Sequence, residues 1–236
     1  MKMTPEDFAK LPCVDGEIQC PPADYSLIHR FPGGCAFGKR CYFGAQSKFL
    51  EWCSFANVCS FDTGCRFGPG CRFGHGCSFG SMCDLEGMCK FGRRCSFGEG
   101  CNFDADCSFG EACGFGAGVH FNERCNFGNA CNFDEACSFG EECSFGEECS
   151  FAEGCTFEGG VAKPGRPFIN IGGLGSEART TYAFNLVTGI KIRCGCFCGT
   201  LDQFRLRVRE RHGETHHTKS YLAWAALVEA EFGATC

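Results

Sequence analysis

The sequence predicts a mainly β protein: a triangular parallel β-helix of about seven coils, an N-terminal cap and a small C-terminal α/β domain. The main observation is a six-residue phrase that repeats without a slip over about 21 copies between residues 35 and 160. Its first position is Cys except at Ser47 and Val119, and its third is Phe except at Leu85. Different sequence patterns before and after the repeat indicate a cap over residues 1–34 and a separate domain over residues 161–236.

The pattern inside each phrase predicts a strand with a buried face. Cys and Phe stand two residues apart, so in an extended strand they face the same way, and both are readily buried. The fourth position is Gly or a short residue, such as Ala56 or Asp62, and is expected to form the corner to the next strand. The mostly polar second, fifth and sixth positions then form the outer surface, and three phrases make one coil.

Written from its Phe, the phrase becomes Phe-Gly-x-x-Cys-x. It resembles the hexapeptide repeat of left-handed β-helix proteins, in which a large apolar residue is followed by Gly, Ala, Asp or Glu and, four residues on, by a small residue. The resemblance covers a little over half of the chain and implies a left-handed helix. This sequence departs from the family in having Phe where Leu, Ile or Val is usual. Pentapeptide-repeat helices favour Phe but have a period of five, and they stay as the alternative fold.

The 25 cysteines are expected to be reduced and structural. Nineteen occupy the first position of the repeat, where a small buried apolar group is needed. Stacked Cβ atoms would lie about 4.8 Å apart, beyond the 3.5–4.5 Å or so that a disulfide prefers. The repeat also lacks the paired spacing of structural zinc sites. We therefore predict no metal and no cofactor.

The segment 1–34 is predicted to cap the open end of the β-helix. Thr4 and Pro5, followed by two acids, are typical of a helix start, and Phe8 and Leu11 are expected to cover the exposed end coil. The first ten residues contain no apolar run, and no stretch reaches the roughly 18 apolar residues of a membrane span. A cytoplasmic protein without a membrane partner is expected.

Residues 161–236 are predicted to form a small ββαα domain. Residues 180–186 and 190–197 have the pattern of two strands about a turn, and Thr200 to Gln203 is typical of a capping box that opens a helix. The block 192–201, followed by Phe204 and later by Tyr221-Leu222, resembles the tail domain of uncharacterised tailed-phage repeat proteins. That resemblance implies a viral origin and no particular activity.

A zinc site in this domain is one hypothesis. Cys194, Cys196 and Cys198 alternate and are expected on one strand face, and His212, His216 and His217 are candidate further ligands. The favoured alternative is a buried strand face with solvent-exposed histidines.

The same domain is basic, with ten basic and six acidic residues and a net charge of +4. Its first helix carries four arginines, among them Arg205 and Arg209. Direct binding of nucleic acid is possible on this charge, but docking on the acidic half of the rod, in the same chain or a second copy, is preferred. A homodimer is therefore expected. Exposed apolar residues in the repeat are the other predicted contacts: Leu50, Trp52, Met82 and Met88.

Charge divides the repeat into two halves. Residues 35–94 carry eight basic and four acidic residues, a net charge of +4, whereas residues 95–160 carry one basic and thirteen acidic residues, a net charge of −12. The acidic half would be about 18 Å long, a length over which duplex DNA carries about 10 charges. This similarity, shared with the pentapeptide-repeat proteins that mimic DNA, predicts a partner-binding surface made of Glu111, Glu123, Glu135, Glu141, Glu142, Glu147, Glu148 and Glu153. Acids that serve only solubility are the alternative.

No complete set of catalytic groups is recognisable in the sequence. The favoured hypothesis is a phage-encoded, non-enzymatic inhibitor that binds a host nucleic-acid-handling or antiviral defence enzyme as a nucleic-acid decoy. One alternative is a structural or scaffolding homo-oligomer. Another is a hexapeptide-repeat acyltransferase in which His120, beside Val119, acts as the general base, because imidazole titrates near neutrality.

Overall fold

The protein consists of a β-solenoid followed by a small sheet with two helices. The computed structural model describes residues 1–163, 167–174 and 179–233. They fall into two compact units, Met1–Gly159 and Gly160–Cys236. The first unit is a parallel β-solenoid of about eight turns, which confirms the mainly β, β-helical fold class predicted from the repeat.

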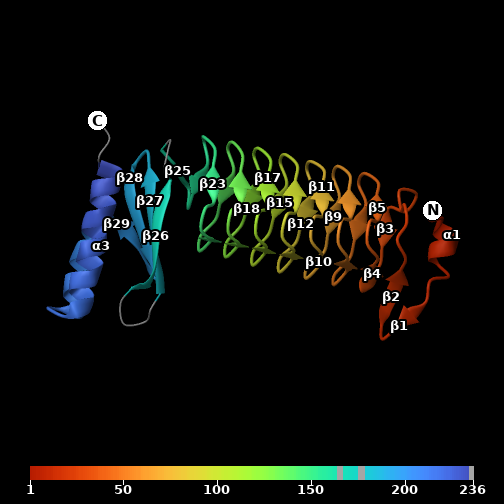
Figure 1. The fold of residues 1–236 in the computed structure, drawn as a ribbon, viewed down its shortest axis with the longest axis horizontal. Helices are drawn as coiled ribbons and strands as arrows, with labels where there is room; N and C mark the ends of the chain where they lie inside the picture. The colour runs from red at the N-terminus through yellow and green to blue at the C-terminus, as the bar shows by residue number, and fades with distance from the viewer. Residues whose placement is uncertain (164–166, 175–178, 234–236) are drawn as a thin grey trace. The chain divides into compact units, whose positions relative to one another are not determined.

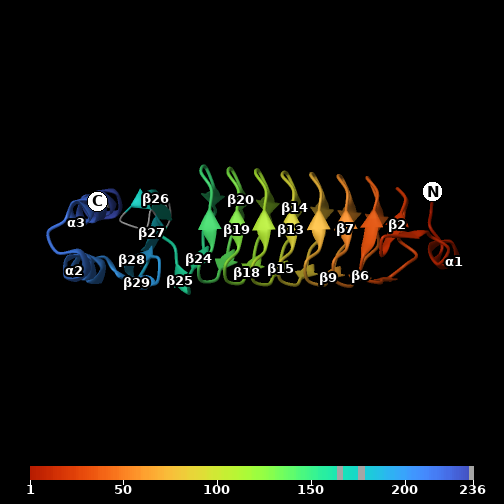
Figure 2. The ribbon, with the colours of Figure 1, turned by 90° about the horizontal axis from the view of Figure 1, so that it is seen from below.

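Three parallel sheets, here called the first, second and third face, run along the solenoid, and their strands recur every 18 residues, as in the pairing of Arg72 with Lys90 (Figures 1 and 2). The first face contains β2 (Glu17–Cys20), β4 (Cys35–Phe37), β7 (Ser54–Phe55), β10 (Arg72–Phe73), β13 (Lys90–Phe91), β16 (Ser108–Phe109), β19 (Asn126–Phe127) and β22 (Ser144–Phe145), with β1 (Cys13–Val14) antiparallel to β2. The second face contains β5 (Tyr42–Phe43), β8 (Ser60–Phe61), β11 (Ser78–Phe79), β14 (Ser96–Phe97), β17 (Gly114–Phe115), β20 (Asn132–Phe133) and β23 (Ser150–Phe151). The third face contains β3 (Arg30–Phe31), β6 (Lys48–Phe49), β9 (Arg66–Phe67), β12 (Asp84–Leu85), β15 (Asn102–Phe103), β18 (His120–Phe121), β21 (Ser138–Phe139) and β24 (Thr156–Phe157).

The axis of the solenoid is filled by three columns of phenylalanine rings. The ring of Phe109 stacks on those of Phe91 and Phe127 at centroid distances of 4.8 and 4.9 Å. It meets the neighbouring columns edge to face, with Phe103 at 4.9 Å and Phe115 at 5.0 Å. Both geometries are favourable for aromatic rings. Each ring therefore contacts others above, below and beside it. This explains why Phe occupies the third position of every phrase but one.

Each cysteine of the repeat points into the core and donates a hydrogen bond to a backbone carbonyl group. The thiols of Cys59 and Cys101 point to the carbonyl oxygens of Gly38 and Gly80, 21 residues earlier, at 3.3 and 3.4 Å. Ser47, which replaces a cysteine, is fully buried and donates to the carbonyl oxygen of Gly44 at 2.7 Å. Buried carbonyl groups need hydrogen-bond donors. A thiol is both a small apolar group and a weak hydrogen-bond donor. None of the 24 cysteines that the structure describes forms a disulfide.

The corners of the coil are made by the sixth residue of each phrase, and the prediction that the fourth residue makes them is wrong. The left-handed backbone conformation occurs at sixth positions such as Arg40, Trp52 and Val58, with φ of 58°, 59° and 65°. The fourth residue lies against the backbone of the preceding turn instead. A Cβ atom at Gly80 would be 2.7 Å from the backbone nitrogen of Thr63. Glycine is therefore common at the fourth position because of close packing between turns.

Replacing Val58 with glycine is expected to stabilise the solenoid. A β-branched residue with a φ of 65° is strained. Glycine relieves this strain but loses more conformational entropy on folding, and the net gain in the free energy of unfolding should be about 0.5–1 kcal/mol. Urea unfolding measures the change, with Val58→Ala as the matched control. Alanine keeps the Cβ atom, so an equal gain in Val58→Ala would show that backbone strain is not the cause.

The solenoid begins before the uninterrupted repeat, because β2 and β3 lie within residues 1–34 and pair with the strands that follow. Tyr25 and Phe31 stand in register with the later phenylalanines, and the ring of Tyr25 stacks on that of Phe43 at 5.3 Å. This additional turn accounts for the difference between the seven coils predicted and the eight observed. The short helix α1 (Pro5–Phe8) has Thr4 as its N-cap, as predicted. The ring of Phe8 covers those of Tyr25 and Phe31.

The second unit contains a four-stranded antiparallel sheet and two helices. After β25 (Gly160–Val161), the sheet has the order β26 (Phe168–Leu174), β27 (Arg179–Leu186), β28 (Gly189–Cys194) and β29 (Phe197–Thr200). The helices are α2 (Leu201–His212) and α3 (His216–Gly233). Their buried faces pack on Ile192 and the rest of a shared core. The predicted ββαα order missed β26, and the strand predicted to reach Phe197 is broken by a turn at Gly195, whose φ is 58°. The predicted capping box at Thr200 is present.

Candidate functional site

The acidic residues lie on the edges of the solenoid. The outward residue of each strand in the acidic half is neutral and polar or small, as in Asn126, Ser144 and Ser150. The acids occupy the corner segments that follow the strands of each face, which we call the first, second and third edge. Between residues 95 and 160 the first edge carries Glu111, Glu147 and Glu148; the second carries Glu99, Asp134, Glu135 and Glu153; and the third carries Asp104, Asp106, Glu123, Glu141, Glu142 and Glu158.

The structure thus divides the eight predicted partner-binding acids among three edges, but it brings four of them around one strand. Glu141 and Glu142 lie before β22, with Cys143 between, and Glu147 and Glu148 lie after it, with Gly146 between. All four are exposed. Backbone hydrogen bonds to the turn before hold them, from Arg124 N to Glu141 O and from Ala130 N to Glu147 O, both 2.8 Å. The first face at β22 is consequently a neutral strip bordered by two pairs of acidic residues.

Only part of this charge is neutralised inside the protein. The guanidinium of Arg124 pairs with Asp106 at 2.9 Å and with Glu123 at 2.7 Å. Its hydrogen bond lowers the pKa of Asp106. Within the described residues, no cationic side chain pairs with the four glutamates that flank β22. Like charges held on neighbouring turns repel each other, so this strip should attract a cationic surface.

The neutral strips between the edges are ordered by ladders of polar side chains. Ser144 donates to Asn126 one turn earlier on the first face, and Ser150 donates to Asn132 at 2.5 Å on the second face. On the third edge, Asn122 donates to Asp104 at 2.9 Å. These bonds join side chains 18 residues apart and fix their orientation from turn to turn.

His120 lies on the third face, where its Nδ1 atom and the Ser138 hydroxyl are 2.5 Å apart. It borders an open groove of about 300 Å³ whose other lining residues include Asp84, Glu86 and Asp104. Carboxylates around the imidazole would repel the phosphates of an anionic acyl donor. The geometry therefore gives little support to the acyltransferase hypothesis.

Three of the four predicted apolar contact residues come together. Leu50, Trp52 and Met88 lie on the third edge within three turns, with exposed fractions of 44, 57 and 50%. The Trp52 ring covers Gly70 in the turn between, because a Cβ atom there would be 2.5 Å from the ring. Met82, 69% exposed, lies on the second edge and is separate from this group.

The two arginines predicted to dock differ in their surroundings. Arg205 pairs within its own unit, with Glu229 at 2.5 Å and Asp202 at 3.4 Å, and its hydrogen bond lowers the pKa of Glu229. Arg209 is exposed on α2.

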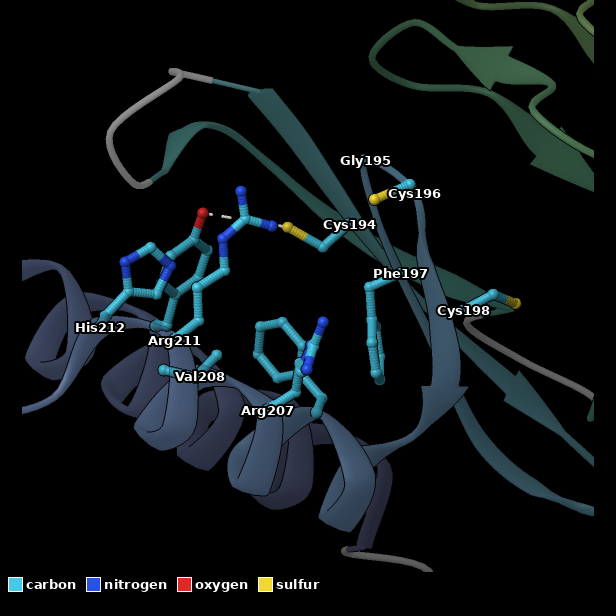
Figure 3. A pocket seen from close by; sticks show the side chains of 11 residues that line it. Cys194, Gly195, Cys196, Phe197, Cys198, Arg207, Val208, Arg211 and His212 are labelled. Atoms are coloured by element: carbon cyan, nitrogen blue, oxygen red, sulfur yellow. Dashed lines mark hydrogen bonds between the residues drawn. The ribbon is translucent and has the colours of Figure 1, made fainter.

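The three cysteines of the zinc hypothesis do not share a strand face, so that expectation is wrong. Cys194 ends β28, Cys196 lies in the turn and Cys198 belongs to β29. Cys194 is paired with Phe197, the residue adjacent to Cys198, so Cys198 takes the opposite side of the hairpin. Figure 3 shows it pointing away from Cys194. In the ranges that the structure describes, no group of three or more His, Cys, Asp or Glu side chains is arranged to hold a metal ion.

A pocket in the second unit was missed by the sequence analysis. It lies between α2 and the hairpin of β28 and β29, and Arg207, Arg211 and Phe204 are among its lining residues. The available signal was the four-residue spacing of Arg207 and Arg211, which places both on one face of a helix.

Comparison of the chain with protein-family models, with curated proteins and with solved structures finds no match in any of the three. Among the helices of the described ranges, none combines the length and the apolar character needed to cross a bilayer.

Proposed function

We propose that the acidic end of the solenoid is a nucleic-acid decoy, which inhibits a nucleic-acid-binding protein by occupying its basic groove. The observation that carries this proposal is the strip on β22, a neutral polar surface bordered by Glu141 and Glu142 on one side and by Glu147 and Glu148 on the other. Two pairs of carboxylates beside a polar strip resemble the phosphates of the two strands beside a groove of duplex DNA.

Charge density and rigidity support the same proposal. The acidic half carries a net charge of −12 over about 18 Å, close to the charge of duplex DNA over that length. Its carboxylates stand on a backbone that is hydrogen-bonded from turn to turn, as at Arg124 and Ala130. A preorganised surface loses little conformational entropy on binding.

The sequence resemblances suggest where such a decoy would act. The hexapeptide-like repeat serves as the rigid framework, and the block 192–201 resembles a domain of tailed-phage proteins. The partner we propose is therefore a host nucleic-acid-handling or antiviral defence enzyme, which a phage protein would meet in the host cytoplasm.

The test is capture from a nuclease-treated bacterial lysate on the immobilised protein, followed by elution with a short DNA duplex. The quadruple variant Glu141→Gln, Glu142→Gln, Glu147→Gln, Glu148→Gln is expected to lose captured nucleic-acid-binding proteins by about tenfold or more, because several charge contacts act together. Added salt should weaken capture by the unmodified protein for the same reason.

The matched control removes four charges elsewhere, in Glu51→Gln, Asp62→Asn, Asp84→Asn and Glu86→Gln, all in the basic half. It should capture as the unmodified protein does. Equal losses in both variants, or captured proteins that the duplex does not displace, would contradict the decoy proposal.

A scaffolding homo-oligomer is the second candidate, favoured by the exposed group of Leu50, Trp52 and Met88. Analytical ultracentrifugation distinguishes it from the decoy. A scaffold should sediment as an oligomer that Trp52→Ser with Met88→Ser dissociates, while the glutamine variant leaves it intact.

A further inference from the structure

The second unit contains a pocket whose walls differ sharply in chemistry. It has a volume of about 360 Å³ and lies between α2, the hairpin of β28 and β29, and the ring of Tyr221 from α3 (Figure 3). This volume is at the lower end of the range for pockets that bind small molecules. The residues that line it are Cys194, Gly195, Cys196, Phe197, Cys198, Phe204, Arg207, Val208, Arg211, His212 and Tyr221.

One wall is aromatic and fixed in place. The ring of Phe204 lies 5.6 Å from that of Phe197 and 5.7 Å from that of Tyr221, and Phe204 and Tyr221 are buried. The Tyr221 hydroxyl donates to the carbonyl oxygen of Leu174 at 3.4 Å and accepts from the Cys194 thiol at 3.9 Å. Cys194 in turn accepts a hydrogen bond from the Thr181 hydroxyl at 3.2 Å. These contacts fix an aromatic wall whose rings are tilted to one another, by 54° between Phe197 and Phe204 and by 83° between Phe204 and Tyr221.

The other wall is cationic. Arg207 and Arg211 stand one helical turn apart on α2, and Figure 3 shows both side chains reaching toward the hairpin. Among the described residues that line the pocket, none is acidic. Arg207 pairs with Glu210 at 3.7 Å, and this contact is exposed on both sides. A guanidinium beside a partly desolvated pocket is well suited to bind phosphate or carboxylate.

We propose that this pocket binds a small anion with a flat ring, of mononucleotide size or below. Its ring would pack on Phe197, Phe204 and Tyr221, and its phosphate or carboxylate would lie between Arg207 and Arg211. The site is independent of the decoy surface, since none of its residues belongs to the solenoid.

Isothermal titration calorimetry of the full chain tests the proposal with five probes. AMP, phenyl phosphate and benzoate combine a ring with an anionic group, adenosine has the ring without the charge, and inorganic phosphate has the charge without the ring. At least one of the first three should bind with a Kd below about 1 mM, and the last two should bind at least about tenfold more weakly. A preference for phenyl phosphate or for benzoate shows which anionic group the arginines recognise.

Three variants localise the binding. Arg207→Gln and Arg211→Gln should each weaken it by about tenfold or more, since each removes a charge-assisted hydrogen bond. Arg209→Gln removes the same charge from the same helix outside the pocket and should leave the Kd unchanged. The proposal is overturned if none of the three ring-bearing anions binds, if inorganic phosphate binds equally well, or if Arg209→Gln is as damaging as the other two.

Discussion

Replacing Phe109 with alanine is expected to destabilise the solenoid by about 3–5 kcal/mol. Its side chain is 5% exposed and its ring contacts six others, two stacked and four edge to face. Alanine removes all of these contacts and leaves a cavity that turns fixed by backbone hydrogen bonds cannot close. Urea unfolding monitored by circular dichroism measures the loss.

Ser108→Ala is the matched control, because Ser108 precedes Phe109 on the same strand and faces outward. It should change the free energy of unfolding by less than about 0.5 kcal/mol. Phe109→Leu should fall between the two, since Leu85 occupies the equivalent place in another turn and is 2% exposed. A loss below about 1 kcal/mol in Phe109→Ala would show that the ring columns do not hold the turns together.

The cysteines of the repeat are expected to resist alkylation by iodoacetamide under native conditions. Only a thiolate reacts, and burial disfavours the charged thiolate. At Cys101 the hydrogen-bonding contact with Cys83 and burial both raise the pKa. Reagent can reach such thiols only after the turns open, and an opening free energy of several kcal/mol slows labelling by about 10³-fold or more. Mass spectrometry over time should therefore separate two classes of cysteine.

The fast class should contain Cys13, Cys196 and Cys198, the exposed cysteines of the described ranges. Cys236 lies outside the described residues, so the experiment is best done in a Cys236→Ser background. Cys13→Ser should remove one fast modification, and denaturant should make every cysteine reactive. Rapid native labelling of Cys101 would contradict the buried ladder of thiols.

The repeat made most of the solenoid predictable. A period of six fixes which residues face inward, so the phenylalanine and cysteine columns followed from spacing alone. The corner was misassigned because the fourth position is rich in glycine, and glycine there serves close packing: at Gly80 the missing Cβ atom gives room to the backbone of Thr63. The left-handed sixth position is glycine in some phrases, such as Gly64 and Gly76, but residues as different as Trp52 and Val58 occupy it elsewhere. Its glycine signal is therefore weaker than that of the fourth position.

The candidate sites were less predictable because they depend on which turns and which elements lie next to one another in space. The negative charge of residues 95–160 is plain in the sequence, but the strip around β22 appears only when the phrases are assigned to faces. In the second unit the turn at Gly195 decides where the thiols point, and the alternation of Cys194, Cys196 and Cys198 suggested one unbroken strand. The pocket beside it requires the packing of α2 on the hairpin, which no local pattern specifies.

The 18-residue period of the coil also determines how a change in the length of the repeat would alter the solenoid. Adding or removing 18 residues within the repeat would change the number of turns and leave every later residue on its own face. Adding or removing six would preserve the buried columns equally well but would transfer everything downstream to the next face. Such a change would rotate the four glutamates around β22 by one third of a turn relative to the basic half. The solenoid can therefore vary its reach in steps of one turn and its angular display in steps of one phrase, while its core stays the same.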